Sequence, residues 1–248
     1  MSRPLRTVLV GATGRMGMAV EQAADRDGGF ELVAKVTRAN LERLEADLGQ
    51  LSADLIIDFS APDALQRLAA IAARTGTPLL SGTTGLTDSV EAALNEAATA
   101  IPLLHTANTS LGVAMLRRLV TLTSHALPAT FDIEIVETHH RLKKDAPSGT
   151  ARLLADAARR GRAEAVVMET ARFGHIAPRK QGEIGMAALR GGDVIGEHTV
   201  HFLGDGERVE LTHRATDRSL FASGALTAGR WLVQQPAGRY TMDHLFGG

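Results

Sequence analysis

Residues 7–17 read TVLVGATGRMG, and this stretch decides the fold of the N-terminal part of the chain. The apolar run Thr7–Val10 predicts a buried strand, and the apolar residues of 16–23 recur at the spacing of one helical face. The glycines therefore lie where a strand turns into a helix. Their G-x-x-G-x-x-G spacing is related to the dinucleotide fingerprint, in which a turn without Cβ atoms lets backbone amides approach a pyrophosphate. An ordinary glycine-rich turn is the alternative.

Gly17 falls inside this predicted helix, where glycine costs about 1 kcal/mol relative to alanine. Close packing of the helix on the strand would explain its presence. We therefore expect the backbone to approach closely at this position.

Alternating strands and helices follow up to residue 105. We expect strands at 30–36, 54–59, 78–81 and 102–105, and helices around 41–51, 64–72 and 90–97. The segment 54–59 (DLIIDF) is almost entirely apolar, as a parallel sheet buried on both faces requires. This pattern predicts a doubly wound α/β domain that binds its ligand at the carboxyl ends of the strands.

Polar turns follow three of these strands, at 60–62, 82–85 and 107–110. Their hydroxyls, amides and glycines suit the ribose and carboxamide of a nicotinamide nucleotide. Each turn alone could be a helix cap, which is the commoner role of Ser, Thr and Asn. Their joint placement at strand ends favours a cofactor site.

The second strand ends at Thr37-Arg38, where the fingerprint places the residue that meets the adenosine ribose. An acidic residue there would favour a free 2′-hydroxyl, whereas the Arg38 guanidinium could pair with a 2′-phosphate. We therefore expect NADPH to be preferred, with some use of NADH. The alternative is a solvated surface arginine.

Residues 134–151 read EIVETHHRLKKDAPSGTA and form the second informative stretch. Residues 131–137 alternate as a strand, and Ser148 is suited to be the N-cap of a helix over 149–158. The strand-to-helix loop is expected to carry His139, His140, Arg141, Lys143 and Lys144. These side chains would face the free amides at the start of the helix, in an arrangement suited to an anion.

From residue 111 the pattern changes. One long helix leads to this stretch, and short strands follow at 166–168, 184–189, 194–202 and 208–214. Glycine-rich turns separate the strands, which predicts an antiparallel or mixed sheet in a second, α+β domain. A final helix is expected at 220–232.

Composition restricts the function classes. The 248 residues include 27 basic and 28 acidic side chains, so no general positive field favours nucleic acid or an anionic membrane. There is no cysteine, hence neither a disulfide nor a thiol nucleophile. We find no signal-peptide pattern and no apolar stretch long enough to span a membrane. We expect a cytoplasmic protein that binds a small molecule.

Several motifs together resemble the family of 4-hydroxy-tetrahydrodipicolinate reductases, also called dihydrodipicolinate reductases. These are GATGRMG (11–17), DFS (58–60), GTTG (82–85), AN (107–108), ETHH (137–140), Lys143, DAPSGT (145–150) and GEHT (196–199). The resemblance implies reduction of 4-hydroxy-tetrahydrodipicolinate to tetrahydrodipicolinate by NADH or NADPH, in lysine and diaminopimelate biosynthesis. It also implies a Rossmann-like domain formed by both chain ends (1–109 and 217–248), a central substrate and oligomerisation domain (110–216), and a homotetramer.

The resemblance assigns roles to particular residues. It implies that His139 is the acid/base histidine and Lys143 the proton donor. Among the predicted substrate contacts, His140, Gly149 and Thr150 match the family, and Ser148 is added because it opens the anion-binding helix. The implied cofactor contacts are Gly11, Ala12, Thr13, Gly14, Arg15, Met16, Gly82, Thr83, Thr84, Ala107, Asn108, Thr109 and Ser110, to which we add Arg38.

Two features depart from the family pattern. Thr37 replaces an acidic ribose ligand, and the segment 39–53 is shorter than in other members. Three alternatives stay open: a related reductase acting on an aspartate-derived semialdehyde, a nucleotide sensor without turnover, and a metal site at the paired histidines. The sequence lacks a third ligand at a zinc-like spacing and a thioester-forming cysteine. The roles of Glu197 and His198 are left open.

Overall fold

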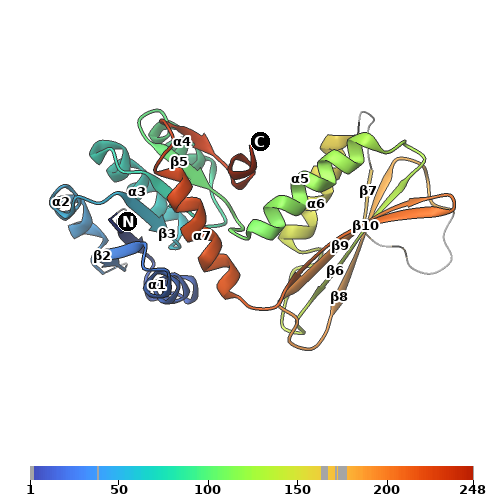
Figure 1. Cartoon of the computed structure of the whole chain (residues 1–248), viewed down its shortest axis with the longest axis horizontal. Coiled ribbons are helices and arrows are strands. Elements are labelled where there is room, and N and C mark those ends of the chain that lie inside the picture. The colour runs from blue at the N-terminus through green and yellow to red at the C-terminus, as the bar shows by residue number, and fades with distance from the viewer. Residues whose placement is uncertain (1–2, 38, 163–166, 171, 173–177, 248) are drawn as a thin grey trace. The chain divides into compact units, whose positions relative to one another are not determined.

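The computed structural model describes residues 3–37, 39–162, 167–170, 172 and 178–247, and the chain divides into two compact units. The first unit combines Met1–Leu111 with Ser219–Gly248, and the second comprises Gly112–Arg218. Each unit has its own sheet and its own covering helices (Figure 1).

The first unit is built on a six-stranded parallel sheet in the order β11-β5-β4-β3-β1-β2. Its strands are β1 (Leu5–Val10), β2 (Phe30–Val36), β3 (Leu55–Asp58), β4 (Leu79–Ser81), β5 (Pro102–His105) and β11 (Gly238–Tyr240). The chain runs from β1 to β2 on one side and then to β3 on the other, which creates a switch point at the end of β1. The predicted Rossmann-like sheet formed by both chain ends is confirmed. The sequence analysis did not identify β11, which is only three residues long.

Helices cover both faces of this sheet. Those of the first unit are α1 (Arg15–Asp27), α2 (Leu41–Leu51), α3 (Pro62–Thr75), α4 (Asp88–Ala97), α7 (Ser219–Leu232) and the 3-10 helix η1 (Met242–Phe246). Helices α2, α3 and α4 pack over the face that carries Val8, Val10 and Ile56. Helices α1 and α7 contact one another, and Gly229 of α7 lies against Leu55 and Ile57 on the other face.

The second unit is built on a five-stranded sheet in the order β10-β9-β6-β8-β7. Its strands are β6 (Asp132–His139), β7 (Val167–Glu169), β8 (Glu183–Arg190), β9 (Gly196–Gly204) and β10 (Glu207–Ala215). β6 pairs parallel with β8 and antiparallel with β9, so the sheet is mixed, as predicted. Residue 166, which the sequence analysis placed in a strand, lies outside the described residues.

Two helices, α5 (Leu111–Ala126) and α6 (Gly149–Gly161), pack on one face of this mixed sheet. Leu116 and Leu154 meet Phe202 in the shared core. The helices lie close together, since a Cβ on Gly161 would be 2.4 Å from the carbonyl oxygen of Thr121. α6 begins where predicted, because the Ser148 hydroxyl accepts a hydrogen bond from the Ala151 amide at 3.1 Å.

The end of β6 corrects one expectation. The sequence analysis ended this strand at Glu137 and placed both histidines on the following loop, but His139 is the last residue of β6. It pairs with Arg190 of β8, and its carbonyl accepts from the Gly191 amide at 3.0 Å. Because side chains alternate along a strand, Glu137 and His139 share the buried face of β6. His140 begins the loop.

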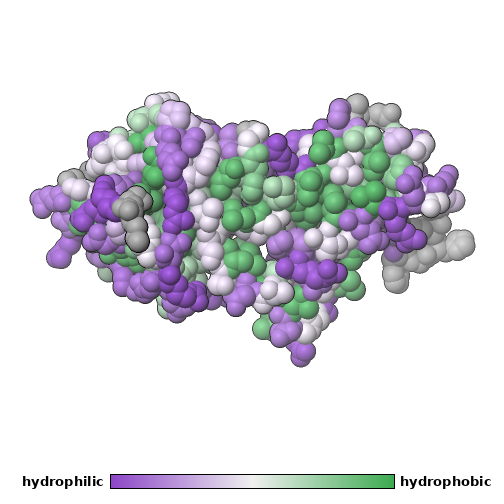
Figure 2. Space-filling view, viewed as in Figure 1, coloured by the Kyte–Doolittle hydropathy of each residue, from purple (hydrophilic) through white to green (hydrophobic). Residues whose placement is uncertain are grey.

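Some apolar side chains remain at the surface. Met115, Leu119 and Leu122 of α5 are exposed, and Figure 2 shows apolar surface over this helix. Leu189 of β8 is also exposed. Among the described helices, none is both long and apolar enough to cross a membrane.

Candidate active site

The glycine loop between β1 and α1 lies at the switch point of the parallel sheet. Gly11 has a φ of +79°, and a Cβ there would be 2.3 Å from the carbonyl oxygen of Phe59 at the end of β3. A Cβ on Gly17 would lie 2.3 Å from the carbonyl oxygen of Gly11, so the close approach expected at this position is present. Both positions therefore require glycine. α1 follows an extended Gly14 without a side-chain cap, which leaves its first amides available to a phosphate.

The turns after β3 and β4 are joined by Asp58, which is fully buried. Its carboxylate accepts hydrogen bonds from the hydroxyls of Ser60 (2.5 Å), Ser81 (2.7 Å) and Thr83 (2.8 Å). The Ser60 amide also donates to Asp58 at 3.1 Å. Burial raises the pKa of the Asp58 carboxyl, against the opposing effect of these hydrogen bonds. The cluster fixes both turns beside the glycine loop.

Among the predicted cofactor residues in these turns, Thr83 is buried and its hydroxyl is used by Asp58. Thr84 is exposed. Gly82 packs against the Phe59 ring, with which a Cβ would collide at 2.2 Å. Thr84 is therefore the side chain that this turn presents to solvent, while Gly82 and Thr83 hold its shape.

The third turn, after β5, is also held by its own polar groups. The Asn108 side-chain oxygen accepts from the Ser110 amide at 2.8 Å, and the Thr109 hydroxyl donates to the carbonyl oxygen of Phe221 in α7 at 2.7 Å. Thr109 and Ser110 are buried, whereas Ala107 is exposed. The structure thus brings the glycine loop and the three polar turns to the carboxyl edge of one sheet.

The adenosine end of the expected cofactor site is only partly described. Arg38 lies outside the described residues. The amide and hydroxyl of Thr37 both donate to the side-chain oxygen of Asn40, at 2.6 and 3.1 Å. Asn40 was not singled out from the sequence; its only signal is that Asn is common in turns and at the residue before a helix.

In the second unit, the buried carboxylate of Glu137 contacts the predicted catalytic residue His139. One oxygen (Oε2) lies 2.6 Å from His139 Nδ1 and 2.8 Å from Arg190 Nη1. The other (Oε1) accepts from Arg190 Nη2 at 2.8 Å and from the Ser148 amide at 3.0 Å. Burial alone would raise the pKa of the Glu137 carboxyl, but the bonds from Arg190, His139 and Ser148 hold it below its ordinary value.

The protonation of His139 follows from this arrangement. Because the Glu137 carboxylate can only accept, its contact with Nδ1 favours the tautomer that carries the proton on Nδ1 and leaves Nε2 as the acceptor. Burial lowers the pKa of His139, and the nearby positive charge of Lys143 acts in the same direction. The imidazole is therefore neutral at pH 7 and close enough to Lys143 to be coupled to it electrostatically.

His198 of β9 completes the buried side of this cluster. Its ring centroid lies 5.1 Å from that of His139, and its Nε2 is 3.1 Å from the Ser148 hydroxyl. Burial lowers the pKa of His198 to about 4, and His139 contributes to the shift. His198 is thus a neutral support for Ser148.

The loop after β6 carries the remaining predicted residues. Lys143 Nζ is 2.8 Å from Asp145 Oδ1, and this hydrogen bond holds the pKa of Asp145 below its ordinary value. The His140 amide donates to the Val194 carbonyl oxygen at 2.7 Å. A Cβ on Gly149 would meet no other atom within 4 Å, so the space above the first turn of α6 is open. The helix start can therefore be approached by an anion.

Matches to family models decide the relationship. The model of the dihydrodipicolinate reductase N-terminus matches residues 5–109, and the model of the dihydrodipicolinate reductase C-terminus matches residues 112–246. The chain belongs to the dihydrodipicolinate reductase family. As a member, it is an oxidoreductase with a Rossmann-type nucleotide-binding unit.

Individual relatives agree with this over nearly full length. The 4-hydroxy-tetrahydrodipicolinate reductase of Zymomonas mobilis is 44% identical over 244 residues, covering 96% of each chain. That of Halorhodospira halophila is 40% identical, covering 96% of this chain and 97% of the relative. The dipicolinate-bound dihydrodipicolinate reductase structure from Paenisporosarcina sp. TG-14 has the same fold, with a TM-score of 0.78 at 22% identity over 96% of this chain and 97% of that one.

The geometry adds residues to those that the family resemblance indicated. Glu137 appeared only as part of a motif, Arg190 was not singled out, and His198 had no assigned role. The signal for Glu137 was its position two residues before His139, which places both side chains on one face of a strand. Arg190 gave no local signal, because parallel pairing of β6 with β8 brings it to Glu137 from 53 residues away.

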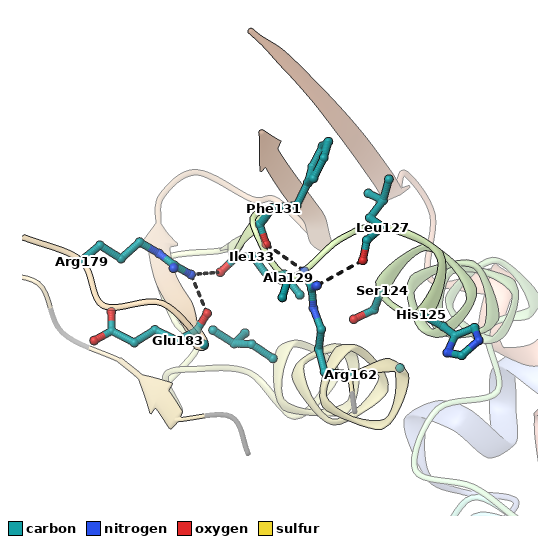
Figure 3. A pocket seen from close by; sticks show the side chains of 12 residues that line it. Ser124, His125, Leu127, Ala129, Phe131, Ile133, Arg162, Arg179 and Glu183 are labelled. Atoms are coloured by element: carbon teal, nitrogen blue, oxygen red, sulfur yellow. Dashed lines mark hydrogen bonds between the residues drawn. The ribbon is translucent and has the colours of Figure 1, made fainter. Parts of the chain in front are cut away.

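A cavity of about 220 Å³ in the second unit lies away from these residues (Figure 3). It is lined by the C-terminal parts of α5 and α6 and the beginnings of β6 and β8. Its two arginines are engaged: Arg162 donates to the carbonyl oxygens of Pro128 and Phe131, and Arg179 donates to that of Ile133. Of the predicted site residues that the structure describes, none lines this cavity.

Proposed function

We propose that the chain reduces 4-hydroxy-tetrahydrodipicolinate to tetrahydrodipicolinate with NADPH or NADH, in lysine and diaminopimelate biosynthesis. The observation that carries the proposal is the cluster of the second unit, where His139, Lys143 and the open start of α6 accompany a buried carboxylate. The product has one hydroxyl fewer than the substrate, so a hydride and a proton are taken up and the 4-hydroxyl leaves as water. Such a cluster can bind the dicarboxylate and transfer the proton.

The nicotinamide nucleotide, when bound, supplies the hydride. The glycine loop fits such a nucleotide, because a Cβ at Gly11 or Gly17 would collide with backbone. In this proposal Gly11–Met16 hold the pyrophosphate, and the turns at 82–84 and 107–110 present backbone groups and Thr84 to the nicotinamide half.

The residues of the second unit bind and protonate the substrate. The amides of Gly149 and Thr150 and the ammonium of Lys143 receive a carboxylate, with His140 beside them. Ser148 contributes mainly through the helix cap, because its hydroxyl accepts from the Ala151 amide and its own amide donates to Glu137. Lys143 donates the proton, and neutral His139, with a free Nε2, acts as the acid/base group.

The test is nicotinamide oxidation followed by absorbance, with freshly made 4-hydroxy-tetrahydrodipicolinate and each nucleotide in turn. We expect rapid oxidation that depends on this substrate, and loss of turnover in His139→Ala and Lys143→Ala with nucleotide affinity near that of the wild type. Nucleotide binding without oxidation would instead favour another substrate or a sensor. Loss of nucleotide binding in either variant would show that the site is misplaced.

The preference for NADPH is a separate part of the proposal. It is supported by Arg38 in the sequence and by the absence of an acidic residue at position 37, whose Thr hydroxyl is bonded to Asn40. Arg38→Ala should raise KM for NADPH and leave KM for NADH nearly unchanged. Equal changes for both nucleotides would contradict recognition of a 2′-phosphate.

We also propose a homotetramer formed through the central sheets, and a cytoplasmic location. The family resemblance is the ground for this assembly, and the exposed side chain of Leu189 on β8 gives a position at which to test it. Light scattering on the protein as it elutes from a size-exclusion column should give a mass about four times the chain mass of 26.3 kDa. If the wild-type protein has the mass of one chain, and Leu189→Lys has the same mass, the assembly is contradicted.

A further inference from the structure

We propose that Glu137 is a positioning residue for His139: its carboxylate holds the imidazole in the Nδ1–H tautomer and connects it to Arg190 and to the start of α6. Only the expected effect of Glu137 on kcat rests on the proposed function. The tautomer itself is a property of the protein without substrate.

Both oxygens of the Glu137 carboxylate are occupied by hydrogen bonds within the protein. Glu137 is 1% exposed, and its two oxygens receive four hydrogen bonds from three residues. The Arg190 guanidinium binds both oxygens, a geometry that fixes the plane of the carboxylate. The orientation of His139 is therefore set by a group that cannot rotate independently.

The remaining ring nitrogen of His139 lies close to β9. A Cβ on Gly196 of β9 would be 3.0 Å from His139 Nε2, so the ring passes close to this glycine. With Nδ1 bound to Glu137, Nε2 is the atom left for a proton that enters or leaves. In the other tautomer the carboxylate would face an acceptor nitrogen, which is repulsive, and with the ring flipped it would face the Cδ2–H group and lose the hydrogen bond.

Charged and titratable groups face the imidazole from several elements. Glu137 faces it from β6, Arg190 from β8, His198 from β9 and Lys143 from the loop. Of these, only Glu137 raises the pKa of His139, while burial, Lys143 and Arg190 lower it. Replacing the Glu137 carboxylate with an amide should thus make His139 harder to protonate.

The first measurement is the tautomer of His139 in the wild-type chain, by ¹⁵N spectra of histidine-labelled protein. The chain has nine histidines, so the signals are assigned by their loss in His139→Asn. We expect the Nδ1–H tautomer at neutral pH. A proton on Nε2 would overturn the inference. The measurement is made on the wild-type chain, so its result does not depend on whether a Glu137 variant folds.

The second measurement uses Glu137→Gln with a matched control. Glu134→Gln makes the same change on the same strand, but Glu134 lies on the opposite face and pairs with Arg172 and Arg179. We expect Glu137→Gln to populate both tautomers of His139, to lower kcat by about 10-fold or more because part of the enzyme then holds the wrong tautomer, and to move the limb of the pH profile due to His139 to lower pH. Glu134→Gln should leave all three unchanged.

The outcomes separate this inference from the proposed reaction. Glu137→Gln that lowers Tm but keeps the wild-type tautomer and pH limb would show a purely structural ion pair, and the inference would fail. A wild-type chain that shows the expected tautomer but does not oxidise NADPH or NADH in the presence of 4-hydroxy-tetrahydrodipicolinate would support the positioning role and overturn the proposed reaction.

Discussion

Asp58 in the first unit and Glu137 in the second are both buried carboxylates near the ends of central strands, yet their partners differ in kind. Asp58 accepts from three hydroxyls and one amide. Glu137 accepts from a guanidinium, an imidazole and an amide. Burial raises the pKa of Asp58, whereas the partners of Glu137 outweigh burial and lower its pKa.

The difference separates two tasks that a buried carboxylate can perform. Neutral donors around Asp58 join the turns after β3 and β4 without placing a cation there, so the cluster fixes loop geometry. Around Glu137, a guanidinium balances the negative charge, so the carboxylate can hold a neutral histidine without forcing it to protonate. The first cluster supports a binding surface, and the second supports proton transfer.

The largest expected effect comes from removing the cation of the second cluster. Arg190→Met leaves Glu137 buried with one oxygen bound only to His139, and breaking such a pair typically costs about 3–5 kcal/mol. Urea unfolding should show this loss. Arg172→Met breaks ion pairs with Glu134 and Glu183, which are only partly exposed, but Glu134 keeps its pair with Arg179, so the loss should be about 1 kcal/mol or less. Equal losses in the two variants would remove the distinction between the two arginines.

The corresponding break in the first unit is Asp58→Ala. It leaves the buried hydroxyls of Ser81 and Thr83 without their acceptor, and each unsatisfied buried group costs about 1–3 kcal/mol. We expect a loss of about 2–3 kcal/mol on urea unfolding and weaker NADPH binding, measured by calorimetry. Asp58→Asn keeps one acceptor oxygen and resembles the protonated carboxyl, so it should lose less. If Asp58→Ala binds NADPH as tightly as the wild type, the cluster does not shape the site.

Both clusters show where sequence reasoning stops. The strand and helix periods predicted the parallel sheet, and the N-cap at Ser148 was identified from one residue and the apolar spacing behind it. Ser81 and Thr83 reach Asp58 because β3 and β4 are neighbours in the sheet. The sequence around these residues does not indicate which strands pair. The polar residues at 138–140 suggested a loop, but the ladder to β8 and β9 extends the strand to His139.

The two carboxylates should also differ in the sign of their pH dependence. Glu137 has a folded-state pKa below its ordinary 4.5, so its stabilisation is fully present above that value and is lost as pH falls through the lowered pKa. Asp58 has a folded-state pKa above its ordinary 3.8, so the folded state binds this proton more tightly and gains stability as pH falls through the raised pKa. These contributions are measured as differences between wild type and each amide variant.

Urea unfolding at several pH values from neutral downward gives the comparison. The stability of the wild type relative to Glu137→Gln should decrease as pH falls, and that relative to Asp58→Asn should increase. Parallel trends in both differences would contradict the opposite environments of the two carboxylates.

The smallest effect is expected at Thr83. It tests whether the residues that hydrogen-bond to Asp58 are different from those that contact the cofactor. Thr83→Val removes one of the hydroxyls bound to Asp58, whose other partners remain. The free energy of unfolding should therefore fall by about 1 kcal/mol. Because the Thr83 side chain is buried, Kd for NADPH should change less than twofold. Thr84→Val, at the exposed neighbouring position, should leave stability unchanged and weaken NADPH binding. If Thr83→Val weakens NADPH binding as much as Thr84→Val does, the Thr83 hydroxyl contacts the nucleotide. The same residue would then both hold the turn and bind the cofactor.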